Sequence, residues 1–220
     1  MNTLKNIIQS NEERKGFLSN RLFQILAAIF ILSWFYFFAT TRDLTNWWIE
    51  NILVLLFIPW FYVLNRKFLF SNTSLIFLFF FLWIHIYGAQ MSYTYNTAGE
   101  WFRTTFDLWR NPYDRFVHFN FGLLMVFPTW DYLVYRWQAP VKWSYFIATL
   151  LLFAMATFFE LIEWFVAAIS DSATGETYVA TQGDVWDAHK DIGLAWIAAT
   201  LVMTLLYFYI KKKKAIVQIP

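Results

Sequence analysis

Histidine, aspartate and glutamate residues lie inside long apolar stretches of this 220-residue sequence. An ionisable side chain at the centre of a bilayer costs about 3 kcal/mol or more, so such residues are rare in membrane-spanning segments and are usually functional. Lipid cannot solvate them, so we expect them to face one another or a water-filled cavity. The candidates are His85, Asp114, His118, Glu160, Glu163, Asp184, Asp187 and Asp191.

The spacing of these residues places most of them on shared helix faces, because neighbours at three, four or seven residues lie on one side of a helix. The sets are Asp114 with His118, Glu160 with Glu163, and Asp184 with Asp187 and Asp191. The motif Thr181-Gln182-Gly183-Asp184 is also typical of a helix N-terminus, with aspartate in place of the glutamate of a capping box. Asp184 therefore has a second interpretation, as a cap.

A mixture of imidazole and carboxylate groups suits Zn²⁺, Mn²⁺ or Fe²⁺, in a site of one or two metals. We predict the metal ligands to be His85, His118, Glu160, Glu163, Asp184 and Asp187. Asp114 and Asp191 are predicted to be catalytic, as a general base or as a group that orients a ligand. Carboxylates crowded in one pocket require cations, and the candidates are Arg110, Arg115, Lys190 or a bound metal.

Six apolar stretches are long enough, or nearly so, to cross a bilayer as helices, which takes about 17–25 residues. They cover residues 22–40, 47–64, 75–91, 116–135, 143–169 and 185–210. The first is longer than the apolar core of a signal peptide, about 7–15 residues, so we expect it to be retained. The sequence predicts an all-α fold, a bundle of six transmembrane helices that forms a single transmembrane domain over residues 1–220.

The composition agrees with an integral membrane protein. Hydrophobic residues make up 59% of the chain and charged residues 15%, whereas soluble domains carry about 25% charged residues. The 26 Phe, 13 Trp and 12 Tyr exclude disorder, and the net charge of +2 is too small for a nucleic-acid binder. Cysteine is absent, which excludes disulfides, thiolate metal sites and cysteine nucleophiles. Membrane lipids are the partners that we expect.

Basic residues predict the orientation. With six spans, both termini share a side with the loops at 65–74 and 136–142, and twelve basic residues lie there: Lys5, Arg14, Lys15, Arg21, Arg66, Lys67, Arg136, Lys142 and Lys211 to Lys214. The other side carries four: Arg42, Arg103, Arg110 and Arg115. The positive-inside rule therefore places both termini in the cytoplasm. The candidate residues then belong to the outer half of the membrane, and Asp131, with Arg136 nearby, is the one deep acid of the inner half.

Three segments carry a resemblance to a known family: Asn111 to Phe119 (NPYDRFVHF), Phe159 to Trp164 (FELIEW) and Thr181 to Asp187 (TQGDVWD). With them, the chain resembles the YjdF family of bacterial inner-membrane proteins over residues 80–215. The third span, with His85 to Gln90 followed by Tyr93-Thr94-Tyr95, is also similar to the family. The resemblance implies a polytopic fold in the bacterial inner membrane and does not imply a reaction.

Three functions remain open. The leading hypothesis is metal-dependent chemistry on a lipid or another amphiphile reached from the outer leaflet, either hydrolysis or group transfer with a metal-bound water, or oxidation with a redox metal. The second is a transporter with an outward-facing cation or proton site, although the sequence shows neither an inverted repeat nor a pair of broken helices. The third is a structural or accessory membrane subunit, in which the polar residues join helices.

Overall fold

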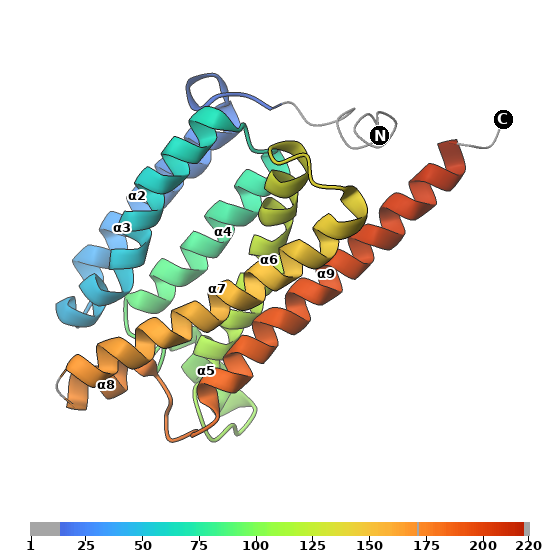
Figure 1. Cartoon of the computed structure of the whole chain (residues 1–220). Coiled ribbons are helices and arrows are strands. Elements are labelled where there is room, and N and C mark those ends of the chain that lie inside the picture. Colours follow the sequence, from blue (N-terminus) through green and yellow to red (C-terminus); the bar gives the residue numbers. More distant parts are fainter. Residues whose placement is uncertain (1–13, 171, 218–220) are drawn as a thin grey trace.

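The structure, a computed structural model, describes residues 14–170 and 172–217, so Lys5 of the predicted cytoplasmic set lies outside the described residues. Over these ranges the chain forms eight α-helices and one short 3-10 turn, and no strand (Figure 1). The predicted all-α fold is therefore confirmed for the part of the chain that the structure describes.

Six long helices correspond to the six predicted apolar stretches. They are α2 (Arg21–Thr40), α3 (Leu44–Lys67), α4 (Asn72–Ala89), α6 (Tyr113–Tyr135), α7 (Val141–Ile169) and α9 (Asp187–Val217). Three short elements that the sequence analysis did not predict are η1 (Phe17–Ser19), α5 (Thr97–Thr105) and α8 (Ser172–Val179). Both α5 and α8 lie in the longer segments that separate α4 from α6 and α7 from α9.

Five of the long helices, α2, α3, α4, α7 and α9, are long and apolar enough to cross a membrane, where the sequence predicts six. The exception is α6, which has 23 residues but carries Asp114, Arg115, His118 and Asp131. This helix can be polar because it packs against α4, α7 and α9, so that 13 of its residues are buried. Protein, and not lipid, surrounds its polar side chains.

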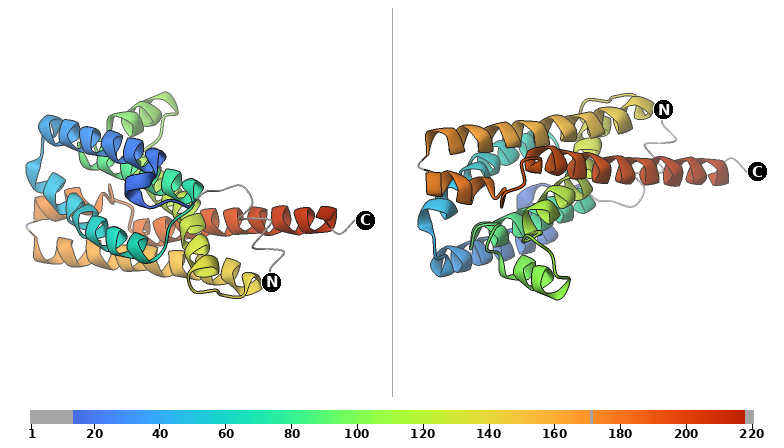
Figure 2. Two further views of the ribbon diagram at one scale, coloured as in Figure 1. Left: turned by 90° about the horizontal axis from the view of Figure 1, so that it is seen from above. Right: turned by 90° about the horizontal axis from the view of Figure 1, so that it is seen from below.

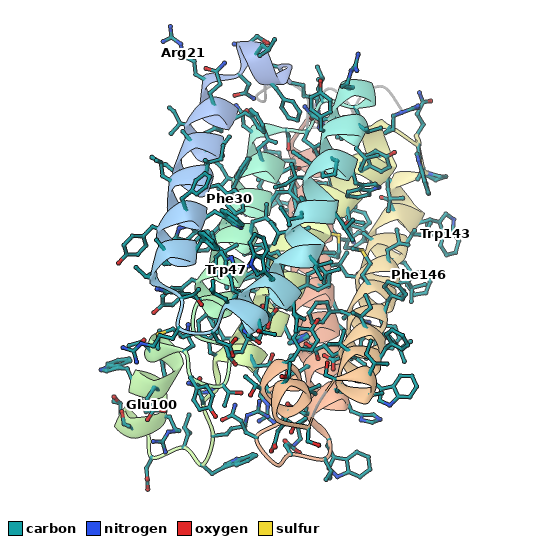
Figure 3. The ribbon with its side chains drawn as sticks, turned by 90° about the vertical axis from the view of Figure 1, so that its left-hand side faces the viewer. Arg21, Phe30, Trp47, Glu100, Trp143 and Phe146 are labelled. Atoms are coloured by element: carbon teal, nitrogen blue, oxygen red, sulfur yellow. The ribbon has the colours of Figure 1, made fainter. Side chains whose placement is uncertain are left out.

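The outer surface of the long helices is apolar, as lipid requires. Figure 3 shows Trp143 and Phe146 of α7 directed away from the bundle, where 57% and 58% of their surface is exposed. Trp47, by contrast, lies among the helices and is fully buried. Because a soluble protein would bury such large side chains, these exposed aromatic residues indicate a lipid-facing surface.

The turns of the bundle gather at two ends. At the end where α2 begins, the Asn20 amide donates to Asn72 Oδ1 at 3.0 Å. At the opposite end, the Thr41 hydroxyl donates to the Gln90 carbonyl at 2.8 Å. We call these the terminal end and the loop end. The described chain begins and ends at the terminal end, whereas α5 and α8 lie at the loop end (Figure 2).

The deep acid Asp131 is held at the terminal end. It pairs with Arg14, whose Nη2 donates to Oδ1 at 2.5 Å, and not with Arg136, which is exposed. The Ser74 hydroxyl and the Ser71 backbone N–H donate to Asp131 Oδ2 at 2.7 and 3.2 Å. These bonds tie the segment before α2 and the start of α4 to α6.

Among the described helices, α6 and α9 share the most extensive contact, and their backbones approach closely at Gly122. A Cβ atom on Gly122 would lie 1.9 Å from the Ala195 carbonyl oxygen, and Ala195, Ala198 and Ala199 are fully buried. Small residues let two helix backbones approach, which is the usual way in which transmembrane helices gain packing energy. The position of α6 therefore depends on the absence of a side chain at Gly122.

We predict that Gly122→Ala separates α6 from α9 and destabilises the protein by about 1–3 kcal/mol, the usual cost of overpacking. Thermal unfolding in detergent would measure the loss. The matched control is Gly193→Ala, because a Cβ atom there meets nothing within 4 Å and alanine favours the helix. Equal melting temperatures for the two variants would contradict this prediction.

Candidate functional site

The loop end holds a group of ionisable side chains, most of them buried, from four helices and the segments before α6 and α9, which we call the polar cluster. Its carboxyl and imidazole groups are at most 9% exposed. The members are Glu50 of α3, Arg110, Asp114, Arg115 and His118 in or before α6, Glu160 and Glu163 of α7, and Asp184, Asp187, Lys190 and Asp191 in or before α9. The structure thus brings together seven of the eight candidates that the sequence analysis named.

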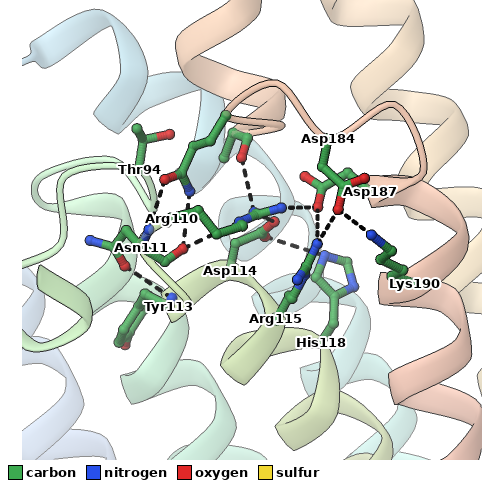
Figure 4. A network of polar contacts seen from close by, with 12 residues as sticks. Thr94, Arg110, Asn111, Tyr113, Asp114, Arg115, His118, Asp184, Asp187 and Lys190 are labelled. Carbon is green, nitrogen blue, oxygen red and sulfur yellow. Dashed lines mark hydrogen bonds and ion pairs between the residues drawn. The ribbon is translucent and has the colours of Figure 1, made fainter. Parts of the chain in front are cut away.

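Arg110 occupies the middle of the network in Figure 4. Its guanidinium is 3% exposed and donates to the Asp187 carboxylate and, at 3.1 Å, to the Ala180 carbonyl. A third contact reaches Asp114 Oδ2 at 3.4 Å. Since a buried charge is costly unless it is paired and hydrogen-bonded, Arg110 and Asp187 stabilise each other where α6 and α9 begin.

Two further cations pair with Asp184. The Arg115 guanidinium donates to the Asp184 carboxylate and lies 3.3 Å from Asp187 Oδ1, and the Lys190 ammonium donates to Asp184 Oδ2 at 2.5 Å. Arg110, Arg115 and Lys190, which the sequence analysis names as candidate cations beside a bound metal, therefore pair with Asp184 and Asp187. The Lys190 ammonium, the Trp186 backbone N–H and the Arg115 guanidinium lower the pKa of Asp184 to about 2.

The predicted start of the last helix is wrong, because the motif Thr181 to Asp184 does not begin the helix. Ala180, Gln182 and Gly183 have positive φ angles of 53°, 51° and 86°, so the chain turns there and the helix begins at Asp187. Thr181 is therefore not the N-cap of a capping box. Asp184 lies before the helix, where its Oδ1 accepts from the Trp186 N–H at 3.1 Å.

Asp114, His118 and Asp191 form the tightest group of ligand atoms in the described residues. One atom from each lies within 4.8 Å of the others, and all three side chains are buried. His118 Nε2 is 3.5 Å from Asp114 Oδ1 and 3.4 Å from Glu160 Oε1. Asp191 Oδ1 and Glu160 Oε1 are buried without a hydrogen bond. We call Asp114, His118 and Asp191 the ligand trio.

The ligand trio combines residues for which the sequence analysis predicts two different roles, metal ligand and catalytic group. Among the predicted metal ligands, His118 belongs to it and Glu160 touches it. Glu163 interacts with Glu160. The carboxylates of Asp184 and Asp187 form ion pairs with arginine and lysine side chains. Asp114 and Asp191, which the sequence analysis places in catalysis, supply the other two ligand atoms.

His85 lies outside the ligand trio. Its Nε2 donates to the Glu50 carbonyl at 3.2 Å, and its Nδ1 lies 2.6 Å from the Tyr93 hydroxyl. Both ring nitrogens are therefore engaged by neighbours in α3 and in the segment after α4. We leave His85 out of the proposed ligand set for this reason.

Glu50 belongs to the polar cluster, although the sequence analysis did not name it. Its side chain is 3% exposed, and it interacts electrostatically with Asp114 and His118. The available signal was that Glu50 is the only charged residue in the predicted span 47–64. By the reasoning applied to Glu160, such a residue is a candidate.

An apolar cavity of about 650 Å³ adjoins the polar cluster, between α3, α4, α6 and α7. Its walls are hydrocarbon and aromatic side chains except for His85, Tyr93 and His118. The His118 side chain therefore lines this cavity and also belongs to the ligand trio.

We predict that the Asp184 ion pairs stabilise the protein in a pH-dependent way. The folded pKa, about 2, lies below the ordinary 3.8, so the stabilisation is complete above pH 4 and declines as the pH falls from about 4 to about 2. Asp184→Asn should therefore melt below wild type at about pH 6, and the difference should shrink at about pH 2.5. Asp107→Asn, at an exposed position, is the control. A difference that does not change with pH would contradict the prediction.

Comparison with known proteins agrees with this architecture. The family of predicted membrane proteins DUF2238 matches residues 21–212, from the start of α2 to the basic end of α9. The inner membrane protein YjdF of Escherichia coli (strain K12) is 26% identical over 175 residues, which cover 79% of this chain and 83% of that protein. No solved structure matches. The expected resemblance to YjdF is confirmed, and the chain belongs to the DUF2238 family of predicted membrane proteins.

Proposed function

We propose that this multi-pass membrane protein is an enzyme that binds one divalent metal ion at Asp114, His118 and Asp191 and acts on a lipid or another amphiphile. The observation that carries the proposal is the buried, unpartnered Oδ1 of Asp191 in the ligand trio. A buried polar atom without a partner costs about 1–3 kcal/mol, and more when it is charged. A cation between the three side chains would remove that cost.

The charges of the polar cluster support a bound cation. Arg110, Arg115 and Lys190 pair with Asp184 and Asp187, and Arg110 reaches Asp114 only at 3.4 Å. Four buried carboxyl groups have no lysine or arginine nitrogen within 4.0 Å among the described residues: Glu50, Glu160, Glu163 and Asp191. These carboxyl groups without a lysine or arginine partner lie on the side of the cluster that contains the ligand trio.

One imidazole and two carboxylates suit Zn²⁺, Mn²⁺ or Fe²⁺, as the sequence analysis expects. Such an ion, when bound, supplies Lewis acidity and an activated water. Glu160 Oε1 has no hydrogen bond and lies 3.4 Å from His118 Nε2, so this carboxyl group is placed to accept a proton from a water at the ligand trio. Glu163, next to Glu160, is placed to share that proton.

The amphiphile is inferred from the neighbouring cavity. His118 is the residue common to the ligand trio and to the cavity wall. A substrate with a polar reacting group and an apolar body would place the first at the ligand trio and the second in the cavity. A small polar substrate would leave the cavity without a function.

We further propose six spans with both termini in the cytoplasm. Because α6 runs through the middle of the bundle, between α4, α7 and α9, it crosses the membrane with them in spite of its polarity. The described chain begins and ends at one end of the bundle, which an even number of spans requires (Figure 2). Most basic residues lie at this terminal end, and the positive-inside rule makes it cytoplasmic.

We predict that detergent-purified wild type contains near-stoichiometric Zn, Mn or Fe, or takes up one of them at micromolar concentration. His118→Ala and Asp191→Asn should each lower the metal content at least tenfold, because each removes one of three ligands. Elemental analysis would measure this. His189→Ala, at an exposed position on α9, should keep the metal.

Thermal unfolding of the same preparations separates loss of a ligand from loss of the fold, since Asp191→Asn keeps the shape of the side chain. Wild type that is free of metal and binds none of the three ions would overturn the metal proposal. A variant set in which only the melting temperature changes would favour the structural role.

We predict the orientation to be visible by cysteine labelling, because the chain has no cysteine of its own. Asp107→Cys at the loop end should react with a membrane-impermeant maleimide on intact spheroplasts. Gln138→Cys, which is also exposed but lies between α6 and α7 at the terminal end, should react only after permeabilisation. The reverse pattern would place the loop end in the cytoplasm.

A further inference from the structure

We infer that the apolar cavity binds one acyl chain of a membrane phospholipid, which enters sideways from the bilayer between α3 and α7. The inference rests on the proposed function in one respect, since it makes the phospholipid the class of substrate whose polar part meets the ligand trio. Binding of the chain itself requires no metal.

The walls of the cavity suit hydrocarbon and do not suit a polar solute. A volume of about 650 Å³ lies within the range of about 300–1,000 Å³ that ligand sites occupy. Of 20 lining residues, only His85, Tyr93 and His118 carry an ionisable group, and the side chains of His85 and Tyr93 are hydrogen-bonded to each other. Water needs two or more polar partners, which most of this surface lacks.

The cavity opens toward lipid because α3 and α7 hardly contact each other within the described chain. The main contacts of α3 are with α4 and α8, whereas α7 packs on α6, α8 and α9. Residues on both sides of the opening line the cavity and are also exposed, notably Trp60 of α3 (55%) and Phe158 of α7 (64%). In a bilayer, the molecules that meet this opening are lipids.

The depth of the cavity corresponds to one leaflet. On α7 its wall runs from Leu151 to Ile162, which is about 16 Å at 1.5 Å per residue. The hydrocarbon core of a bilayer is about 30 Å thick, so a single leaflet contributes about 15 Å. An acyl chain of a lipid in the leaflet at the loop end therefore fits along the full length of this wall.

The polarity of the cavity walls determines the direction in which the acyl chain lies. His118, a member of the ligand trio, lies near the loop end of α6, and His85 lies near the loop end of α4. Met125 and Leu151, at the other end of the cavity, are apolar. The glycerol and head group thus lie at the polar cluster, and the methyl end of the chain lies near Met125.

The test uses the purified full-length protein in vesicles of phosphatidylethanolamine and phosphatidylglycerol. A small fraction of the phosphatidylglycerol carries a diazirine at the methyl end of one acyl chain, and peptide mass spectrometry maps the sites labelled on illumination. We expect the label on Met125 and Leu151. Ala154→Trp should reduce it at least fivefold, because Ala154 lines the cavity on its exposed side, where an indole ring fits without disturbing the core.

Ala168→Trp is the matched control, since Ala168 is an exposed alanine of the same helix that does not line the cavity. It should leave the labelling unchanged. Label spread evenly over lipid-facing residues and insensitive to Ala154→Trp would overturn the inference. Label that a polyprenol displaces and an excess of unlabelled phospholipid does not would also overturn it.

The metal content of the same preparations keeps the two proposals apart. Wild type and Ala154→Trp should both contain the metal, whereas Asp191→Asn, which does not line the cavity, should lose the metal and keep the labelling of Met125. Cavity labelling in a protein that binds no metal would leave the lipid site standing without the proposed chemistry. Metal binding without cavity labelling would leave the chemistry without this substrate.

Discussion

Burial of charge at the loop end constrains how α6 and α9, the two helices in the middle of the candidate site, are arranged. The carboxyl groups of the polar cluster are at most 9% exposed, and each must find a cation or a hydrogen bond inside the protein because lipid offers neither. Arg110 meets this requirement for Asp187, and Arg115 and Lys190 meet it for Asp184. These pairs join the beginnings of α6 and α9, so the electrostatic constraint also positions the ligand trio.

The same constraint explains why α6 is central. A helix with Asp114, His118 and Asp131 cannot face lipid, and the apolar helices α4, α7 and α9 enclose it. At the terminal end, Arg14 and two serines satisfy Asp131. Gly122 then allows α9 to approach so closely that no lipid can enter between the two helices. The burial of polar side chains and the close packing at Gly122 therefore both determine the position of α6.

Much of this architecture could be predicted from the sequence. Apolar length located the six long helices, with bounds within about three residues except at the end of α9, which continues past the predicted 210 to Val217. Spacing placed Asp114 with His118 and Asp187 with Asp191. Partners across helices could not be predicted, because spacing reports only neighbours on one helix. For this reason Asp131 was placed near Arg136 and not with Arg14. The turn at Ala180 to Gly183 was missed because its sequence resembles a helix-capping motif. Its left-handed backbone angles are seen only in the structure.

Glu50 and His85 show a second limit of pattern reasoning. Both lie near the loop end of apolar helices, yet the sequence analysis named His85 as a metal ligand and did not name Glu50. The contacts of their neighbours separate them: Tyr93 and the Glu50 carbonyl occupy both nitrogens of His85, whereas the Glu50 side chain interacts with Asp114 and His118. Which atoms are left unpartnered is a property of the assembled bundle and not of any single helix.

The central position of α6 has a consequence for the synthesis of the protein. The chain emerges from the ribosome in order, so α6 is made before α7 and α9, which cover most of its polar surface in the finished bundle. Until α9 is complete, Arg110 lacks Asp187 and Asp114 lacks Asp191 as a neighbour. An α6 left in lipid at that stage would be costly. Stable insertion of α6 therefore depends on helices that are made after it, and a chain truncated before α9 would leave Arg110 and Asp114 without these partners.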